Sequence, residues 1–150
     1  MTVRATRTLA LLCAPLLAVG IAACGNTVST SAFTGESREV AQAISNLQSD
    51  ATAGEEKKIC ANDLAGAVVR RLAGVKGCEA AIKSQLAEVD SLEVSVQSIQ
   101  VTGATASARV KSIYSGKNLI TTLTLVKEGS HWKISGTVGF LVVPKAGTTG

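Results

Sequence analysis

The stretch that decides the fold is LEVSVQSIQV, residues 92–101, where the spacing of apolar residues changes from helical to strand-like. Its first three apolar residues occupy every second position, as in a strand with one buried face. After Val96 the alternation resumes at Ile99 in the opposite phase. One extra residue in a strand produces such a shift, so we expect a β-bulge near Gln97-Ser98.

Three further strands are expected downstream, each bounded by turn-forming residues. Apolar residues alternate with polar ones from Ala106 to Val110 and at Trp132 and Ile134. In the strand between these two, Leu119, Thr121, Leu123 and Leu125 alternate with Ile120, Thr122 and Thr124. The intervening segments are rich in Gly, Ser and Thr: Thr102-Gly103-Ala104, Ser115 to Asn118, and Glu128-Gly129-Ser130. Four strands joined by short turns predict an antiparallel meander with one apolar face.

Upstream of this meander the apolar spacing is that of helices. Val40, Ile44, Leu47 and Ala51 recur every three or four residues, as on one face of a helix that Gly54 ends. Thr34 or Ser37 is the candidate N-terminal cap of this helix.

Two more helical segments follow. The second runs from Glu55 to about Leu72, with a possible interruption at Asn62-Asp63, which could cap a new helix. The third begins at Gly77-Cys78. We therefore predict an α+β fold, in which three N-terminal helices pack on one face of a curved four-stranded antiparallel sheet.

The first 23 residues have the three parts of a secretory signal. Arg4 and Arg7 precede an apolar run from Leu9 to Ala23, which ends in small residues. The run is shorter than the roughly 20 apolar residues of a membrane-spanning helix. We expect residues 1–23 to be removed.

The residues at the end of this segment, Ile21-Ala22-Ala23-Cys24-Gly25, resemble the lipobox of bacterial lipoproteins. The resemblance implies that Cys24 becomes the N-terminus and carries lipid, which anchors the protein to the extracytoplasmic face of the cell membrane. Two acyl chains on one residue give a durable anchor where one is marginal. An ordinary secreted protein with an unpaired Cys24 thiol is the alternative.

Composition argues against nucleic acid as a partner. The chain has 15 Lys and Arg against 11 Asp and Glu, a net charge of +4, and loss of Arg4 and Arg7 would leave +2. A weak, dispersed charge gives no basic surface for phosphates. One Trp, one Tyr and two Phe offer little for base stacking.

Two cysteines, Cys60 and Cys78, are left after Cys13 in the signal and Cys24 at the lipid site. In an oxidising compartment we expect them to form a disulfide. A metal site or a catalytic thiol is the alternative. We predict neither metal nor cofactor, because His131 is the single histidine and zinc usually has four ligands.

The last strands carry a resemblance to a known family. The segment VKEGSHWKI, residues 126–134, combines an apolar strand, an acidic-Gly turn and a Trp-basic-apolar strand. Together with three preceding helices and the cysteine pair, it is similar to nuclear transport factor 2-like domains, most of all to those of small actinobacterial lipoproteins. The resemblance covers residues 36–138 and implies a cone-shaped (cystatin-like) fold, often with a cavity at its open end.

We accordingly divide the chain into a signal (1–23), a flexible tether (24–35), the domain (36–140) and a C-terminal tail (141–150). The segment from Thr137 to Val143 could extend the last strand. Tyr114 and Trp132 are the candidate pocket residues. Because Trp132 points inward in its strand, neighbouring His131 is expected to point outward.

No catalytic residue can be named from the sequence. Asp50, Asp63 and Asp90 lie near expected helix ends or turns and are interpreted as capping or surface groups. We favour a non-catalytic binding or interaction module whose partner is an apolar small molecule, a lipid or an envelope protein, in a cavity lined by aliphatic residues. The alternative is a small isomerase or hydrolase with a buried carboxylate near Tyr114.

Overall fold

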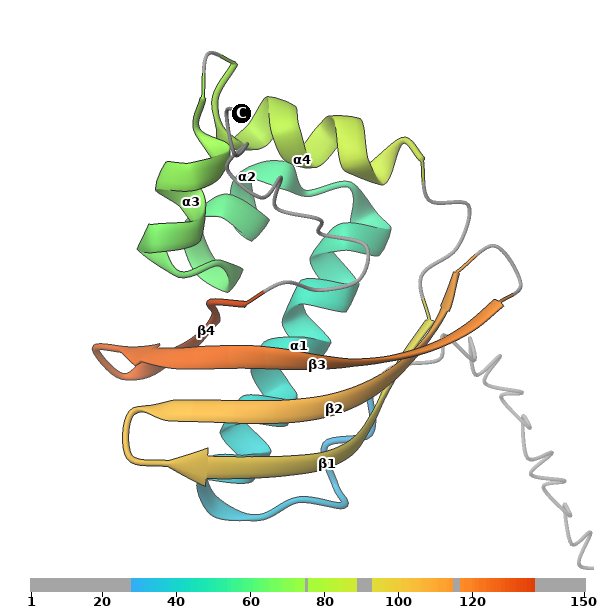
Figure 1. Cartoon of the computed structure of the whole chain (residues 1–150), viewed down its shortest axis with the longest axis vertical. Helices are drawn as coiled ribbons and strands as arrows, with labels where there is room; N and C mark the ends of the chain where they lie inside the picture. The colour runs from blue at the N-terminus through green and yellow to red at the C-terminus, as the bar shows by residue number, and fades with distance from the viewer. Residues whose placement is uncertain (1–27, 75, 89–92, 115–116, 137–150) are drawn as a thin grey trace, which may run out of the picture.

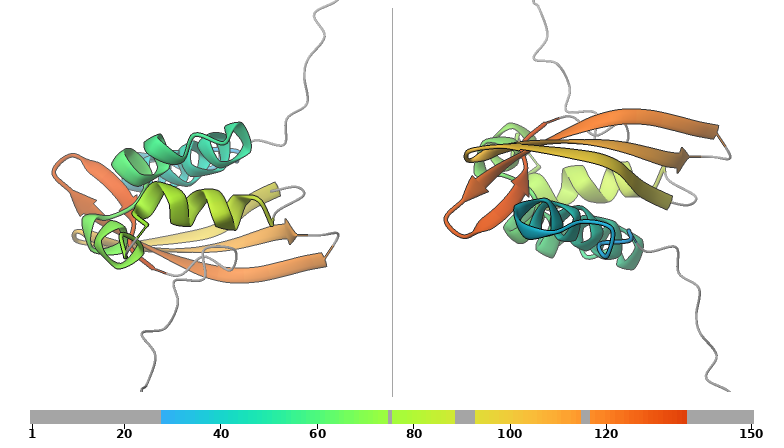
Figure 2. Two further views of the ribbon diagram at one scale, coloured as in Figure 1. Left: turned by 90° about the horizontal axis from the view of Figure 1, so that it is seen from above. Right: turned by 90° about the horizontal axis from the view of Figure 1, so that it is seen from below.

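The computed structural model describes residues 28–74, 76–88, 93–114 and 117–136. Helices form one layer and a four-stranded antiparallel sheet the other, which confirms the predicted α+β class (Figure 1; Figure 2). The strands are β1 (Glu93–Thr102), β2 (Thr105–Tyr114), β3 (Lys117–Glu128) and β4 (His131–Ile134), and their order in the sheet is β1-β2-β3-β4.

The irregularities of the sheet follow from its sequence. The register between β1 and β2 shifts between Val96 and Ser98, which confirms the expected bulge. The turns after β1 and β3 each contain a glycine in the left-handed region, Gly103 with φ of 58° and Gly129 with φ of 64°. Only glycine adopts this conformation at little cost, so both turns can be two residues long.

The first helix, α1 (Gly35–Ala53), follows the predicted pattern. Its four stripe residues are buried, and Gly54 in the left-handed conformation ends it. Thr34 occupies the N-cap position but makes no side-chain capping bond.

The second helical segment is divided into three parts. These are α2 (Glu56–Lys58), the π-helical turn η1 (Ile59–Asp63) and α3 (Gly66–Leu72). The chain is extended at Leu64-Ala65, because Leu64 pairs in parallel with Ile134 and the Ala65 N–H bonds to the Ile134 carbonyl at 2.9 Å. Ala65, and not Asp63, is therefore the N-cap of α3.

The last helix, α4 (Cys78–Leu86), is joined to η1 by the expected disulfide between Cys60 and Cys78. Cys60 lies three residues before Asp63, so the bond holds the turn that carries Asp63 against α4. Ile82 is fully buried on the inner side of α4.

The core fills the space between the two layers. Its largest fully buried side chains come from helices and strands alike: Ile44, Ile59, Leu64, Ile82, Leu123, Leu125, Ile134, Val40 and Val110. Most inward residues of the sheet are those that the alternation predicted, with Ala108 at 0% and Trp132 at 4% exposure. Leu119, near the start of β3, is an exception, because it is 45% exposed. The curved sheet wraps around α1, and the β3–β4 hairpin turns out of the sheet toward the helices (Figure 2).

The predicted signal, Cys24 and the tail beyond Gly136 lie outside the described residues. The tether prediction needs correction at Val28, which is 4% exposed and packs in the core. Burial of an apolar side chain is favourable, so Val28 holds its part of the chain against the domain. The expected tether, residues 24–35, is therefore not flexible along its whole length. None of the helices in the described ranges combines the length and hydropathy that crossing a bilayer requires.

Candidate functional site

A cleft of about 610 Å³ lies between α1, η1 and β4. Twelve residues line it: Gly35, Arg38, Glu39, Gln42, Ala43, Asn46, Asn62, Asp63, Ser130, His131, Trp132 and Lys133. Most of these side chains are polar or charged. The cleft therefore differs from the aliphatic cavity expected for a carrier of apolar molecules.

The α1 wall of the cleft is one face of the helix. Arg38 and Glu39 are adjacent, and Gln42 and Asn46 follow at steps of three or four residues, so the side chains lie along one side of the helix. All four are exposed. The Gln42 Nε2 group donates a hydrogen bond to Asn46 Oδ1 at 2.9 Å, which orients both amides. This wall offers donors, acceptors and charges of both signs to a ligand.

Asp63 is the residue whose environment is most unusual. It is 5% exposed, and its Oδ2 atom has no hydrogen-bond partner among the described residues. Burial raises the pKa of Asp63 to about 7. Asp50 raises it further through its negative charge and a side-chain hydrogen bond, and the charge of Lys133 opposes the increase. The interpretation of Asp63 as a capping or surface group is therefore wrong.

Apart from its apolar neighbours, nothing in the sequence around Asp63 indicates a buried carboxyl. Asp63 ends a π-helical turn between Ile59 and Leu64, both buried, and π-turns are frequent at functional sites. The buried neighbours on either side are the one feature that could have indicated an inward carboxyl. Asp50 is half-buried, and Asp90 lies outside the described residues.

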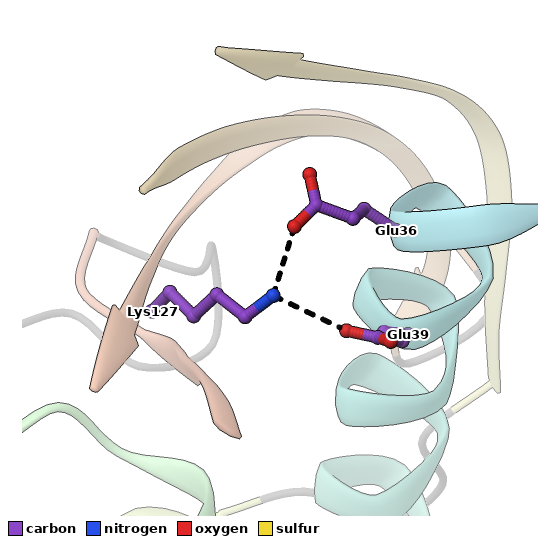
Figure 3. Close-up of polar contacts among 3 residues, drawn as sticks. All are labelled: Glu36, Glu39 and Lys127. Atoms are coloured by element: carbon purple, nitrogen blue, oxygen red, sulfur yellow. Dashed lines mark hydrogen bonds and ion pairs between the residues drawn. The ribbon is translucent and has the colours of Figure 1, made fainter. Parts of the chain in front are cut away.

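Trp132 is a core residue that also contributes to the cleft. Its side chain is 4% exposed, and its Nε1 atom has no hydrogen-bond partner in the described part of the chain. Lys127, directly opposite in β3, places its Nζ atom 5.5 Å from the centre of the Trp132 ring. The same Nζ reaches Glu36 Oε1 at 2.8 Å and Glu39 Oε2 at 3.6 Å (Figure 3). These contacts join the β3–β4 hairpin to the first turns of α1.

The register of the sheet does not bring the two predicted pocket residues together. Tyr114 pairs with Lys117 at the start of β3, whereas Trp132 pairs with Lys127 near its end. Ten residues of strand separate these two pairs, a distance of roughly 33 Å along β3. The side chain of Tyr114 is outside the described part of the structure. His131 is exposed, as predicted, and lines the cleft with Trp132 and Lys133.

Asp63 gives the cleft a group that can exchange a proton. Within the described ranges, no three His, Cys, Asp or Glu side chains gather as metal ligands. The buried carboxyl of Asp63, with a pKa near neutral pH, can donate or accept a hydrogen bond depending on its protonation.

The architecture and a family comparison agree on the type of domain. Helices cover one face of a curved, open four-stranded meander, and residues 71–138 match a family model described as putative lumazine-binding. This arrangement is the one that the sequence resemblance to nuclear transport factor 2-like domains implies. The matched part of the chain runs from the end of α3 past β4 and contains the whole sheet.

Other comparisons add little detail. No curated protein matches the chain. Among solved structures, a protein titled Rd1NTF2_05 with five substitutions is similar at a TM-score of 0.45 and 17% identity. The match covers 67% of this chain and 95% of that one.

Proposed function

We propose that this protein is a membrane-anchored lipoprotein of the cell envelope, whose nuclear transport factor 2-like domain binds a ligand without chemical turnover. The observation that carries the proposal is the cleft between α1, η1 and β4. Its walls contain two buried polar groups, Asp63 Oδ2 and Trp132 Nε1, that no described residue satisfies. Buried polar atoms without partners are costly, and a ligand that reorganises the cleft can satisfy them.

The absence of an activated nucleophile among the described residues supports a binding role. Nucleophilic catalysis needs a Ser, Thr or Cys within hydrogen-bond reach of a base. His131 is exposed, and Cys60 and Cys78 are joined in the disulfide. The polar lining favours a ligand with several hydrogen-bonding groups over the purely apolar molecule expected from the sequence.

The lipid anchor rests on the lipobox-like run that ends at Cys24. We expect labelled palmitate, supplied to cells that express the chain, to appear in the wild-type protein and not in Cys24→Ser. Cys13→Ser is the matched control, because Cys13 lies in the expected signal and should leave labelling unchanged. Labelled Cys24→Ser, or an unlabelled wild-type protein in the membrane fraction, would overturn the anchor.

The binding role is tested by native mass spectrometry of the chain purified from its own host, followed by titration of the emptied protein. Lumazine is one probe, because the matching family is described as putative lumazine-binding. We expect Asn46→Ala, in the cleft, to weaken binding of a retained ligand at least tenfold. Asn118→Ala, exposed on β3 and outside the cleft, should have no effect. Equal binding by both variants would place the ligand elsewhere.

One observation favours the alternative of a small isomerase or hydrolase. A carboxyl with a pKa of about 7 is suited to general acid–base catalysis at neutral pH, and Asp63 has that property. Turnover of a β,γ-unsaturated ketosteroid or of p-nitrophenyl acetate, lost in Asp63→Asn, would establish catalysis. Rates that equal those of buffer would leave the binding role as proposed.

A further inference from the structure

The exposed large apolar side chains of the described chain lie together at one end of the sheet. They are those of Leu119, which is 45% exposed, and Ile120, which is 53% exposed. Adjacent residues of a strand point to opposite faces, so one of these side chains lies on each face of β3. Leu119 pairs with buried Ser112 on the inner face, and Ile120 pairs with Lys111 on the outer face. Both faces of the sheet are therefore open to water at this point.

The end of β2 and the start of β3 extend beyond the helices, which explains this exposure (Figure 2). On the outer face, Ile113 is half-buried and is the diagonal neighbour of Ile120, because Ile113 pairs with Asn118 and Lys111 with Ile120. We call Ile113, Leu119 and Ile120 the apolar arm. Exposed apolar side chains that are grouped in this way mark a surface that contacts a partner or a membrane.

Basic side chains accompany the apolar arm on the outer face of β2. Arg109 is exposed, and half-buried Lys111 lies directly opposite Ile120. The acidic residue of the described sheet at this end is Glu93, which pairs with Ile113. Two cations thus stand against one carboxylate. Lysine and arginine next to a bilayer are attracted to anionic lipid headgroups.

The chain between the expected lipid site and the core is short. Val28 is 4% exposed and packs in the core, and it follows Cys24 by four residues. Four residues span at most about 14 Å. A lipid on Cys24 would therefore hold the domain against the bilayer instead of at a distance from it. The described chain also starts (blue) toward the end of the molecule at which the apolar arm projects (Figure 1; Figure 2, right).

We propose that the apolar arm inserts into the surface of the membrane to which the lipid on Cys24 would anchor the chain. The inference rests on the proposed lipoprotein function and adds a second membrane contact to it. The three apolar side chains would enter the boundary between headgroups and acyl chains, while Arg109 and Lys111 would meet anionic headgroups. Binding of this kind grows with the buried apolar area and with attraction to anionic lipids.

A second contact would also orient the domain. The cleft is lined by Ser130 to Lys133, which lie at the other end of the sheet from the apolar arm. Insertion of the arm would therefore keep the cleft away from the bilayer and accessible to a ligand in the envelope.

The test places a photoreactive diazirine amino acid at position 120 of the full chain, which is purified in detergent and returned to vesicles of phosphatidylglycerol and phosphatidylcholine. Position 100 is the matched control, because Gln100 is exposed on β1 at the opposite end of the sheet. We expect illumination to attach lipid to position 120 severalfold more often than to position 100, as measured by intact mass. Equal lipid yields at both positions, or a covalent dimer in place of the lipid adduct, would overturn the inference.

Substitutions at exposed positions test the two parts of the contact. Leu119→Ser should lower the lipid yield at position 120 severalfold, because it removes apolar area from the arm. Arg109→Gln should lower the yield in vesicles that contain phosphatidylglycerol, and added salt should have the same effect. Lys57→Gln, an exposed position on α2, is the matched control and should leave the yield unchanged. A yield that neither Leu119→Ser nor Arg109→Gln changes would contradict insertion of the arm.

Failure of this inference is distinguishable from failure of the proposed anchor, because the intact mass reports acylation of Cys24 without illumination. An acylated chain whose position 120 does not react with lipid keeps the anchor and refutes insertion of the arm. A chain without acyl groups whose position 120 reacts with lipid refutes the anchor and supports the arm. If neither acylation nor the lipid adduct is found, both proposals fall.

Discussion

Lys127 Nζ lies 2.8 Å from Glu36 Oε1, although 91 positions separate the two residues in the chain. The pair joins β3 to the first turn of α1 beside the cleft (Figure 3). The hydrogen bond to Glu36 raises the pKa of Lys127, so the lysine remains charged at neutral pH.

We expect Lys127→Met to destabilise the fold slightly and to reduce the dependence of the unfolding free energy on salt concentration. Surface ion pairs contribute little and are screened by salt. Urea unfolding at low and high salt measures the effect, with Lys58→Met as a control because Lys58 has a similar exposed partner, Glu55, within its own helix region. If Lys127→Met lost as much unfolding free energy as a truncation in the core, the contact between Lys127 and Glu36 would contribute more than expected for an exposed ion pair.

Asp63 should make stability fall as the pH rises from about 4 to about 7. Folding raises its pKa from 3.8 to about 7, so the folded chain retains a proton in this range that the unfolded chain has lost. At roughly 1.4 kcal/mol per pKa unit, the loss of unfolding free energy is at most about 4 kcal/mol.

The variant Asp63→Asn removes this titration, and we expect it to be more stable than wild type at pH 8 but not at pH 4. Urea unfolding across the pH range gives the difference curve. Asp50→Asn is the matched control: it removes the nearby charge, so the pKa of Asp63 should fall toward its ordinary value. If the unfolding free energies of wild type and Asp63→Asn changed in parallel with pH, Asp63 would not be the group responsible for the pH dependence.

Loss of the disulfide should destabilise the chain by about 3 kcal/mol, from the loop-closure relation for the 18-residue separation. Urea unfolding with and without reductant measures this. The double variant Cys60→Ser/Cys78→Ser should have the same unfolding free energy as the reduced wild type, and reductant should not change it. Because Cys60 shares η1 with Asn62 and Asp63, ligand affinity should fall in the same samples. Unchanged stability of the reduced protein would refute the prediction.

Ile44 and Ile120 provide a comparison of one substitution in two environments. Ile44 is 1% exposed in the core, and Ile120 is 53% exposed on β3. We expect Ile44→Ala to cost about 2–5 kcal/mol of unfolding free energy, as for other buried large-to-small changes. Ile120→Ala should change it by less than about 0.5 kcal/mol. Comparable losses at both positions would mean that Ile120 is covered in solution.

Much of the fold could be predicted from short-range patterns. The alternation of apolar residues placed the four strands, the phase change at Val96 placed the bulge, and the glycines at 103 and 129 placed two turns. Each is a local property, because side-chain direction in a strand and the left-handed conformation depend on neighbouring residues alone. The Cys60–Cys78 bond followed from the small number of available cysteines.

The cleft could not be predicted in this way. Its walls come from α1, η1 and β4, which are distant in the chain, and Asp63 is buried because packing places a π-turn against those elements. Val28 joined the core for the same reason. The sequence alone determined which residues form strands, turns and the first helix, since those preferences are local. Tertiary structure decided which polar groups are removed from water, since burial depends on contacts between distant segments.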